Sequence, residues 1–120
     1  MDKSRKKQIR REFRIAVLER DGYKCVCCGI SGYDRQCGGI HAEQLEPLDA
    51  HHIIDRNRML GGGYVKENGI SLCADCHIKA EVFHSSNGTK GVLGFMPVDL
   101  FEKIKSSAEE AFRAAQKLES

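Results

Sequence analysis

The chain has 120 residues, of which 41% are hydrophobic and 30% are charged, and its formal net charge is +2, which is typical of one soluble globular domain. No apolar run approaches the roughly 20 residues of a membrane-spanning helix, and the N-terminal sequence MDKSRKKQIRR lacks the apolar core of a signal peptide. These features predict a cytoplasmic protein with no membrane partner, in a compartment where thiols stay reduced.

The charge is unevenly distributed along the chain. Residues 1–24 contain nine Lys or Arg and four Asp or Glu, a net charge of +5, whereas the remaining 96 residues carry −3. A basic arm on a mildly acidic body predicts a polyanionic partner such as nucleic acid. The alternative is a solvated helix face that only aids solubility.

In the first half of the chain, one helix and one strand are predicted. Residues 4–20 form a helix in this prediction, which Asp21-Gly22 ends. Its apolar residues recur near the 3.6-residue period, with Lys and Arg opposite: Ile9, Phe13, Ala16 and Val17. Residues 23–29 are predicted to be a cysteine-bearing turn, residues 30–46 an irregular loop, and residues 47–54 a strand.

The second half begins with a predicted loop over residues 55–67, which contains three consecutive glycines. A short strand over residues 70–72 and a helix over residues 74–84 follow, and residues 85–94 are rich in turn formers. Pro97 suits the first turn of a C-terminal helix. This helix has a packing stripe, which we expect to pack within the domain, the alternative being a second copy: Phe101, Ile104, Ala108, Ala111, Ala115 and Leu118.

The six cysteines indicate metal binding rather than disulfides in a reducing compartment. They include two C-x2-C pairs with 44 residues between them, and two such pairs complete the tetrahedron of structural zinc. The predicted zinc ligands are Cys25, Cys28, Cys73 and Cys76. Cys27 also lies in the first cluster, but the two-residue gap followed by Gly29 favours Cys25. We interpret Cys27 and Cys37 as small buried groups, the alternative being a second metal site.

Two adjacent histidines, His51 and His52, stand in the predicted strand, where successive side chains point to opposite faces. The simplest interpretation is one structural and one exposed histidine. However, a zinc ion at the start of the following helix would direct His77 away from the zinc, about 100° further round. The strand before that helix runs beside the first strand, and Asn68 stands at its entrance. These four side chains are therefore expected to converge.

The segments RDGYKCVCCG, DAHHI and EN-x3-LC-x2-CH resemble those of HNH endonucleases over about residues 14–84. The letters of the family name correspond to His52, Asn68 and His77, with 15 and 8 residues between them. This resemblance implies a ββα-metal finger, a single catalytic divalent ion and hydrolysis of a DNA phosphodiester. The chain is also similar to small phage and bacterial proteins of this type.

The resemblance also implies the role of each site residue. His52 would be the general base, since a neutral imidazole can accept a proton from water near neutral pH. His51 and His77 would bind the catalytic metal, and Asn68 would fix the aim of His52 through amide hydrogen bonds. Glu81, one helical turn after His77, matches a third ligand of some relatives. Direct ligation, contact through a water and a surface salt bridge are all open for it.

The expected catalytic cofactor is one divalent ion: Mg²⁺, Mn²⁺ or Ni²⁺. Imidazole ligands favour Mn²⁺ or Ni²⁺ over Mg²⁺. The family pattern implies products with 5′-phosphate and 3′-hydroxyl ends. We expect a twist or bulge at the strand end, which would let His51 bind the metal while His52 reaches the attacking water. A regular ladder through both histidines would fit this less well.

Four further acidic or histidine residues remain, of which His41 and His84 fall outside the family pattern. Asp49 and Asp55 flank the histidine pair, and each is interpreted as a solvated carboxylate, the alternative being a partner that orients an imidazole. His41 and His84 are interpreted as surface or packing histidines.

The DNA contacts are predicted to come from two groups of cations. The residues next to the histidine pair are assigned to phosphates beside the scissile bond, and the N-terminal residues to non-specific attraction. They are Arg56 and Arg58, and Lys6, Lys7, Arg10 and Arg11. A homodimer or a larger phage or bacterial DNA-processing machine is an expected partner. The alternative functions are a non-catalytic zinc finger that binds nucleic acid or protein, and a nuclease subunit that is active only with a partner.

The predicted fold is therefore α+β, a small zinc-stapled domain with a ββα-metal, treble-clef-like finger between N-terminal and C-terminal helices. Within a single domain of residues 1–120, residues 1–21 are the basic helix, residues 22–84 the HNH core, and residues 85–120 a linker and C-terminal helix.

Overall fold

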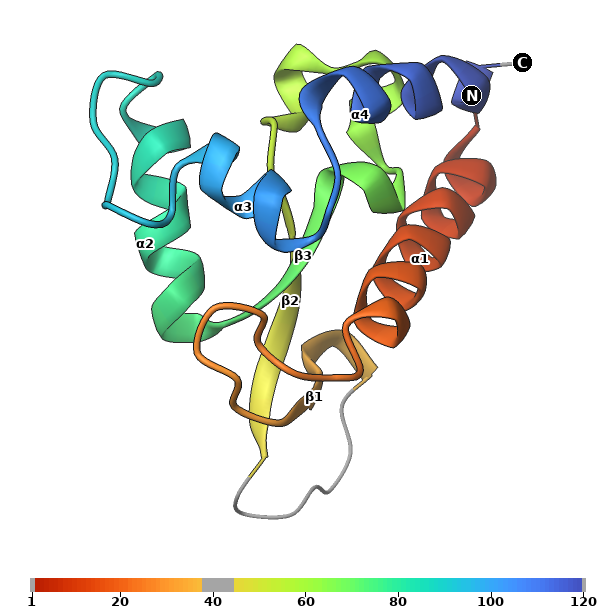
Figure 1. The fold of residues 1–120 in the computed structure, drawn as a ribbon. Helices are drawn as coiled ribbons and strands as arrows, with labels where there is room; N and C mark the ends of the chain where they lie inside the picture. Colours follow the sequence, from red (N-terminus) through yellow and green to blue (C-terminus); the bar gives the residue numbers. More distant parts are fainter. Residues whose placement is uncertain (1, 38–44, 120) are drawn as a thin grey trace.

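The structure is a computed structural model that describes residues 2–37 and 45–119, with helices on both sides of a small sheet (Figure 1). Short 3₁₀ turns fill most of the connection between the last two strands. The helices and strands, in chain order, are α1 (Lys3–Arg20), β1 (Gly32–Asp34), β2 (Glu46–His52), β3 (Gly69–Cys73), α2 (Ala74–Ser85), α3 (Pro97–Lys103) and α4 (Ala108–Ala115). The predicted α+β class is confirmed, and β2, β3 and α2 form its ββα unit.

The sheet has the strand order β1-β2-β3, with β1 parallel to β2 and β2 antiparallel to β3. The register places Leu48 opposite Cys73 and His52 opposite Gly69. Strand β1 lies within the segment that was predicted to be an irregular loop, and that prediction was wrong for these residues. A three-residue strand has too few residues to show an alternating pattern, so its pairing with β2 is decided by the fold.

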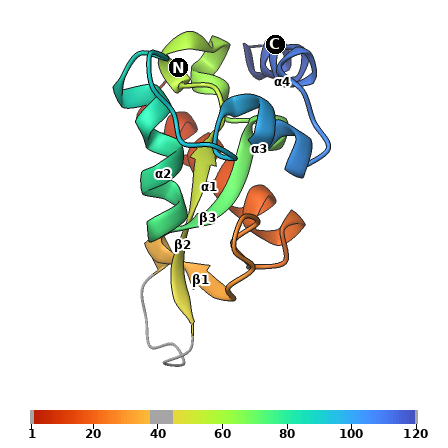
Figure 2. The same cartoon turned by 60° about the vertical axis from the view of Figure 1, so that its left-hand side comes forward.

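Helix α1 covers one face of the β2–β3 ribbon and α2 covers the other (Figures 1 and 2). On the α1 face, a Cβ added to Gly69 would come within 2.8 Å of atoms of Phe13 and Val17. Glycine at this position therefore lets α1 approach the sheet closely. On the α2 face, Ile70 and Leu72 are fully buried.

The ends of α1 are held by side chains that its sequence supplies. Asp2 caps the first turn by accepting a hydrogen bond from the backbone N–H of Arg5 at 2.8 Å. Asp21 ends the helix, and its carboxylate accepts a hydrogen bond from the backbone N–H of Ser71 in β3 at 2.9 Å. Arg20 donates to the backbone carbonyls of Lys66 and Gly69. The last turn of α1 is therefore bound to the start of β3.

The C-terminal region contains two helices rather than the single helix predicted. Helix α3 ends at Lys103, and the chain turns through Lys105, which has a φ of 56°. Helix α4 then begins with Ser107 as its N-cap. The apolar stripe is interrupted because this turn redirects the chain. Most of its members pack within this domain, as expected, but Ala108 is exposed. Phe101, Ala111 and Ala115 are buried in the core.

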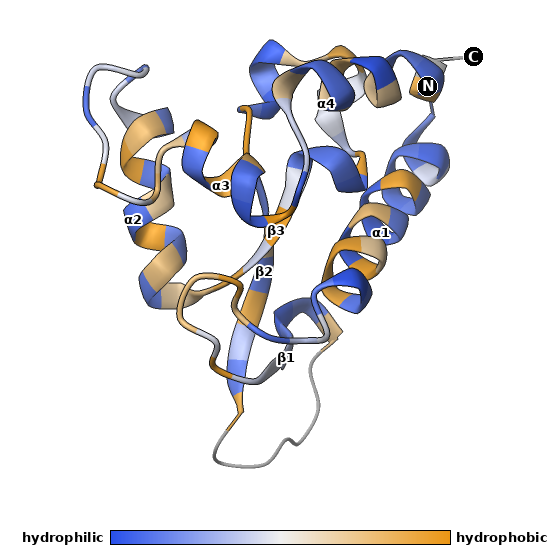
Figure 3. Cartoon of the chain, in the orientation of Figure 1, coloured by the Kyte–Doolittle hydropathy of each residue, from blue (hydrophilic) through white to orange (hydrophobic). Residues whose placement is uncertain are grey.

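The hydropathy of the residues agrees with the way the helices pack on the sheet (Figure 3). Helix α1 is largely hydrophilic, and its buried residues are the apolar Ile9, Phe13, Val17 and Leu18, whereas β3 is buried at every position. Among the described residues, none of the helices has the length and apolar character needed to cross a membrane.

An ion pair joins α1 to the end of β1. Arg14 donates from Nε to the carboxylate of Asp34 at 2.7 Å, and the two side chains are 18% and 6% exposed. Burial alone would raise the pKa of Asp34, but the Arg14 hydrogen bond, with others from Gln36 and Cys37, outweighs burial and lowers it. The charged form of Asp34 is therefore favoured by folding.

We expect Asp34→Asn to lower the free energy of unfolding by about 1–3 kcal/mol at neutral pH, because it weakens a charge-assisted hydrogen bond in a partly buried site. Since the folded pKa is below the unfolded value, the stabilisation is present above the ordinary Asp pKa of about 3.9 and is lost as the pH falls through the folded value. Urea denaturation of the zinc-bound protein at several pH values measures this. Glu109→Gln, in an exposed ion pair with Arg113, is the control and should change little.

Candidate metal centre and catalytic cleft

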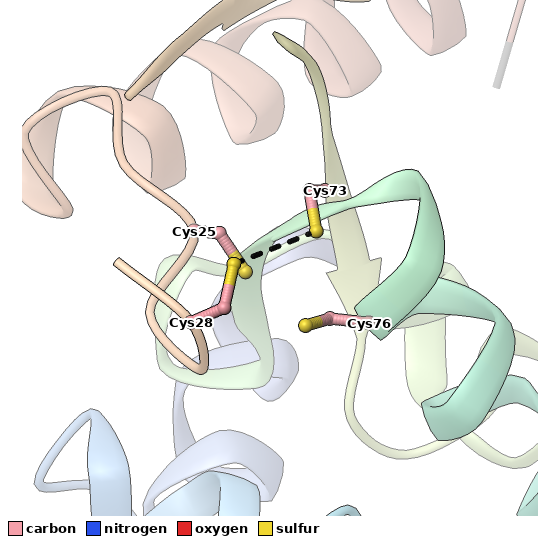
Figure 4. A group of neighbouring side chains, drawn as sticks. All are labelled: Cys25, Cys28, Cys73 and Cys76. Carbon is pink, nitrogen blue, oxygen red and sulfur yellow. Dashed lines mark hydrogen bonds between the residues drawn. The ribbon is translucent and has the colours of Figure 1, made fainter. Parts of the chain in front are cut away.

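The four predicted zinc ligands converge from two parts of the chain (Figure 4). One pair lies in the turn after α1, and the other lies at the junction of β3 and α2. Their sulfur atoms are all within 4.8 Å of one another, and Sγ of Cys28 is 3.7 Å from Sγ of Cys73. This tetrad of thiols can hold a zinc ion in tetrahedral geometry.

Backbone N–H groups stabilise the thiolate form of Cys25, one member of the tetrad. Burial alone would raise the pKa of Cys25, but the backbone N–H groups of Cys73, Cys28 and Cys27 outweigh it and lower the pKa to about 7. The thiolate, which is the form that binds metal, is thereby favoured at this position.

The two cysteines outside the tetrad differ from each other. Cys27 is half-buried against the core, and burial raises the pKa of its thiol to about 11, so it remains protonated. Cys37 is exposed, which contradicts its interpretation as a buried group. It follows the short strand β1, where its thiol donates to the carboxylate of Asp34 at 3.3 Å. Its place in an exposed 3₁₀ turn explains this difference.

A second cluster of metal-binding groups lies between β2 and α2. The ligand atoms of His51, His77 and Glu81 are within 4.8 Å of one another. One carboxylate oxygen of Glu81 is 3.3 Å from Nδ1 of His51 and 3.2 Å from Nε2 of His77. His77 and Glu81 meet His51 because α2, which carries the first two, lies beside β2, which carries the third (Figure 1).

The hydrogen bonding of this cluster fits a metal ion. In the described part of the chain, the buried side-chain nitrogens and oxygens that make no well-aligned hydrogen bond are Nδ1 and Nε2 of His51 and Nε2 of His52, although Nδ1 of His51 lies 3.3 Å from the Glu81 carboxylate. Buried polar atoms rarely lack partners unless the site has a function. Burial lowers the pKa of His51, and contact with His51 lowers the pKa of Glu81 to about 2. A neutral imidazole and an ionised carboxylate are the forms that bind metal.

His52 faces the opposite side of β2 and packs against α1. Its ring stacks on Phe13 with the centroids 4.6 Å apart, and it meets the ring of Tyr64 edge-on at 4.6 Å. Burial, assisted by the charges of His51 and Arg56, lowers the pKa of His52 to about 4. The sequence suggested an ordinary histidine pKa, and the apolar contact with α1 explains the difference. His52 is neutral over a wider range of pH than expected.

The ladder between β2 and β3 is regular through both histidines, and β2 ends at His52. The expected twist or bulge is therefore not needed to place them, because alternation itself sends the two rings to opposite faces. One cavity of about 340 Å³ is nevertheless lined by both histidines together with His77, Glu81 and His84. The end of the strand lets a single space reach both faces.

Asn68 is fully buried and binds the chain that follows His52. Its Oδ1 accepts a hydrogen bond from the backbone N–H of Ile54 at 2.9 Å, and its Nδ2 donates to the carbonyls of Ile54 and Gly63 at 3.1 and 3.3 Å. Gly63 has a φ of 68°, and a Cβ there would come 2.8 Å from Nδ2 of Asn68. The glycine loop therefore needs glycine at this point to meet the amide.

The acidic neighbours of the histidine pair have different surroundings. Asp49 is 3.4 Å from Nδ1 of His77 and 3.1 Å from Nε of Arg35, so it is a partner of an imidazole rather than a solvated carboxylate. This contact raises the pKa of His77. Asp55 caps a 3₁₀ turn by accepting a hydrogen bond from Asn57 N–H. The interaction of Asp49 depends on the α2 position and could not be read from spacing alone.

The two remaining histidines also have separate outcomes. His41 lies outside the described residues. His84 was interpreted as a surface or packing histidine, and it does pack, since its ring stacks on His51 with the centroids 5.2 Å apart, beside the second cluster. Its position two turns along α2 from His77 is a signal that helical periodicity alone could have supplied.

The predicted DNA-binding cations are only partly brought together. Arg10 and Arg56 line a cleft of about 740 Å³ that also contains His52 and His77. A neighbouring cavity of about 420 Å³ is lined by these two arginines and Lys6. Tyr64 also lines both spaces, with the guanidinium of Arg10 over its ring at 5.6 Å. The other three predicted cations are exposed: Lys7, Arg11 and Arg58.

Comparison with known proteins agrees with this geometry. Residues 25–82 match the family model of HNH endonucleases. This match confirms the resemblance to the HNH endonuclease family over residues 25–82, a segment that contains the cysteine tetrad, the second cluster and Asn68. No curated protein and no solved structure gave a significant match to the chain.

We expect the purified chain to contain one zinc ion and to lose both zinc and folded structure in the Cys76→Ser variant. The reason is that three thiolates cannot close the tetrahedral site that joins the two halves of the tetrad. Elemental analysis and circular dichroism measure the two effects. Cys27→Ala is the matched control, because Cys27 lies in the same turn outside the tetrad. Equal zinc content in the wild type and Cys76→Ser would rule out the assignment.

Proposed function

We propose that this protein is a metal-dependent DNA endonuclease that uses His52 as general base and leaves 5′-phosphate and 3′-hydroxyl ends. Support comes from the family of residues 25–82 and from one observation in particular. In the described part of the chain, the buried side-chain nitrogens that make no well-aligned hydrogen bond belong to His51 and His52. Both residues line the cavity that is also lined by His77 and Glu81. A purely structural zinc finger has no need for such a site.

The second cluster would bind a divalent ion, and the neighbouring His52 would accept a proton. His51, His77 and Glu81 would hold the ion, and their imidazole nitrogens favour Mn²⁺ or Ni²⁺. When bound, this ion would supply positive charge that stabilises the phosphate in the transition state. Glu81 is the third ligand in this proposal, since its oxygen lies near both imidazoles.

His52 would accept a proton from the attacking water, because its ring is neutral at physiological pH. The water oxygen forms a bond to phosphorus, and the bond from phosphorus to the 3′ oxygen breaks. That 3′ oxygen takes up a proton from solvent, which gives the 3′-hydroxyl end. The stacking on Phe13 and the hydrogen bonds of Asn68 hold His52 and the chain after it in a fixed geometry.

The DNA backbone would enter through the cleft between α1 and the start of α2. Arg10 and Arg56 line this cleft together with His52, and they would provide two cations beside the proposed scissile phosphate. Arg14 and Arg20 have structural partners instead, since they bind Asp34 and the entrance of β3. Only part of the basic charge of α1 is therefore assigned to DNA.

We expect His52→Ala to reduce cleavage of supercoiled plasmid by at least about 100-fold in the presence of Mn²⁺, since it removes the general base. The variant should keep its zinc, its fold and its affinity for DNA. Gel analysis of a time course measures cleavage, and assays at matched concentrations of Mn²⁺, Ni²⁺ and Mg²⁺ test the metal preference. His52→Gln keeps more of the packing on Phe13 and should be similarly inactive.

Other outcomes would favour the alternative functions. DNA binding by the wild type without cleavage under any of these metals would support a non-catalytic zinc finger. Cleavage that appears only after a larger protein is added would support a subunit of a DNA-processing machine. Full activity in both His52 variants would remove His52 from the proposed chemistry.

We expect the double substitution Arg10→Ala with Arg56→Ala to flatten the salt dependence of DNA affinity. Each phosphate contact contributes about 0.9 to the slope of log affinity against log salt, so the loss should approach about 1.8. Fluorescence anisotropy with duplex DNA measures this in a His52→Ala background, which keeps the DNA intact. Point substitutions are preferable to deleting residues 1–11, because that deletion removes the buried side chain of Ile9.

The control for this measurement is Arg113→Ala, which removes one positive charge from α4, outside the cleft. Its slope should remain close to that of the parent protein. If the two arginine substitutions in the cleft have no larger effect than this control, the cleft is not the path of the DNA.

A further inference from the structure

The backbone carbonyl of His52 lies on the edge of β2 that faces away from β3. The N–H of Ile53 donates to the carbonyl of Asn68 at 2.8 Å, just past His52 and Gly69, the last partners of the ladder. A bond in this place flanks a non-hydrogen-bonded pair of an antiparallel ladder, so the N–H and C=O of His52 point away from β3. Strand β1, on the other edge, pairs with β2 only as far as Leu48 and does not reach His52.

A side chain of α2 binds this carbonyl instead. Nε2 of His84 lies 2.8 Å from the backbone oxygen of His52. A carbonyl oxygen can only accept a hydrogen bond, so Nε2 of His84 carries the proton. This nitrogen is then not free to bind a metal ion, and His84 is not among the residues whose ligand atoms cluster with those of His51.

The ring of His84 is also held in place by its neighbours. It stacks on His51 with an angle of 22° between the rings, and it meets Phe83 edge-on at 6.1 Å. His84 therefore contacts both histidines of the pair, His51 through its ring and His52 through its backbone.

We propose that His84 is a positioning residue for the proposed nuclease reaction, whose Nε2–H bond to the His52 carbonyl fixes the direction of the His52 ring. Asn68 binds the chain just after His52 from the β3 side, and His84 binds His52 itself from the α2 side. The end of β2 at His52 is thus held by hydrogen bonds from both its β3 side and its α2 side. The inference rests on the proposed function for its effect on rate, although the bond itself can be tested separately.

The experiment compares two variants that separate the donor from the ring. His84→Phe keeps an aromatic ring against His51 but loses the N–H donor. His84→Gln loses the ring but carries an amide N–H at a similar reach. We expect His84→Phe to lower kcat by about 10-fold or more, with little change in KM for DNA or in zinc content, as is typical when a supporting hydrogen bond is removed. His84→Gln should restore kcat to within about threefold of the wild type.

A spectroscopic readout keeps this test independent of cleavage. In zinc-bound full-length protein labelled with ¹⁵N, ring nitrogen spectra should show His84 protonated at Nε2. The ring signals of His52 should shift in His84→Phe and return towards their original positions in His84→Gln. A purely structural role would lower the melting temperature in both variants without this rescue.

The outcomes distinguish this inference from the proposed function. If the wild type cleaves DNA and His84→Phe has the same kcat, or if His84→Gln is as slow as His84→Phe, the positioning role is wrong. If the wild type does not cleave DNA, the proposed function fails, and the spectra alone decide whether His84 directs the His52 ring. Unchanged His52 signals in His84→Phe would overturn the inference in that case.

Discussion

The convergence of four thiols is the constraint on which the rest of the structure depends. In small zinc-binding peptides a structural zinc contributes about 10–16 kcal/mol, which is comparable to or larger than the net stability of about 5–15 kcal/mol of a typical domain. The tetrad joins the turn after α1 to the junction of β3 and α2. Because Cys76 and His77 are adjacent in α2, fixing the thiol also fixes the direction of the imidazole. The second cluster, which contains His77, therefore depends on the cysteine tetrad.

The β2–β3 ribbon separates two tasks by the alternation of its side chains. His51 points to α2 and joins the proposed metal ligands, whereas His52 points to α1 and packs on Phe13. Burial keeps both imidazoles neutral, although they face different helices. The cavity at the strand end brings the two faces back together. This arrangement uses the strict two-residue period of a strand, without a bulge, to place two chemically different histidines at one site.

Helix α1 has both structural and surface roles, and its charges divide accordingly. Arg14 and Arg20 bind partners in β1 and at the entrance of β3, so they hold the helix against the sheet. Arg10 faces the cleft beside Tyr64. A sequence count of basic residues treats these cations alike. Their difference arises because the close approach of α1 at Gly69 selects which side of the helix faces protein.

The amino-acid sequence predicted the four cysteines that cluster and the boundaries of α1 and α2 to within one residue, and its family resemblance implied that His51 and His77 share a metal site, with the role of Glu81 left open. The helix boundaries and each C-x2-C pair depend on short spacings whose geometry is local. The three-dimensional fold was needed to find the pairing of β1, the break between α3 and α4, the contact of Asp49 with His77 and the position of His84. Each of these depends on contacts between segments distant in the chain, where packing and long-range hydrogen bonds prevail over local preference.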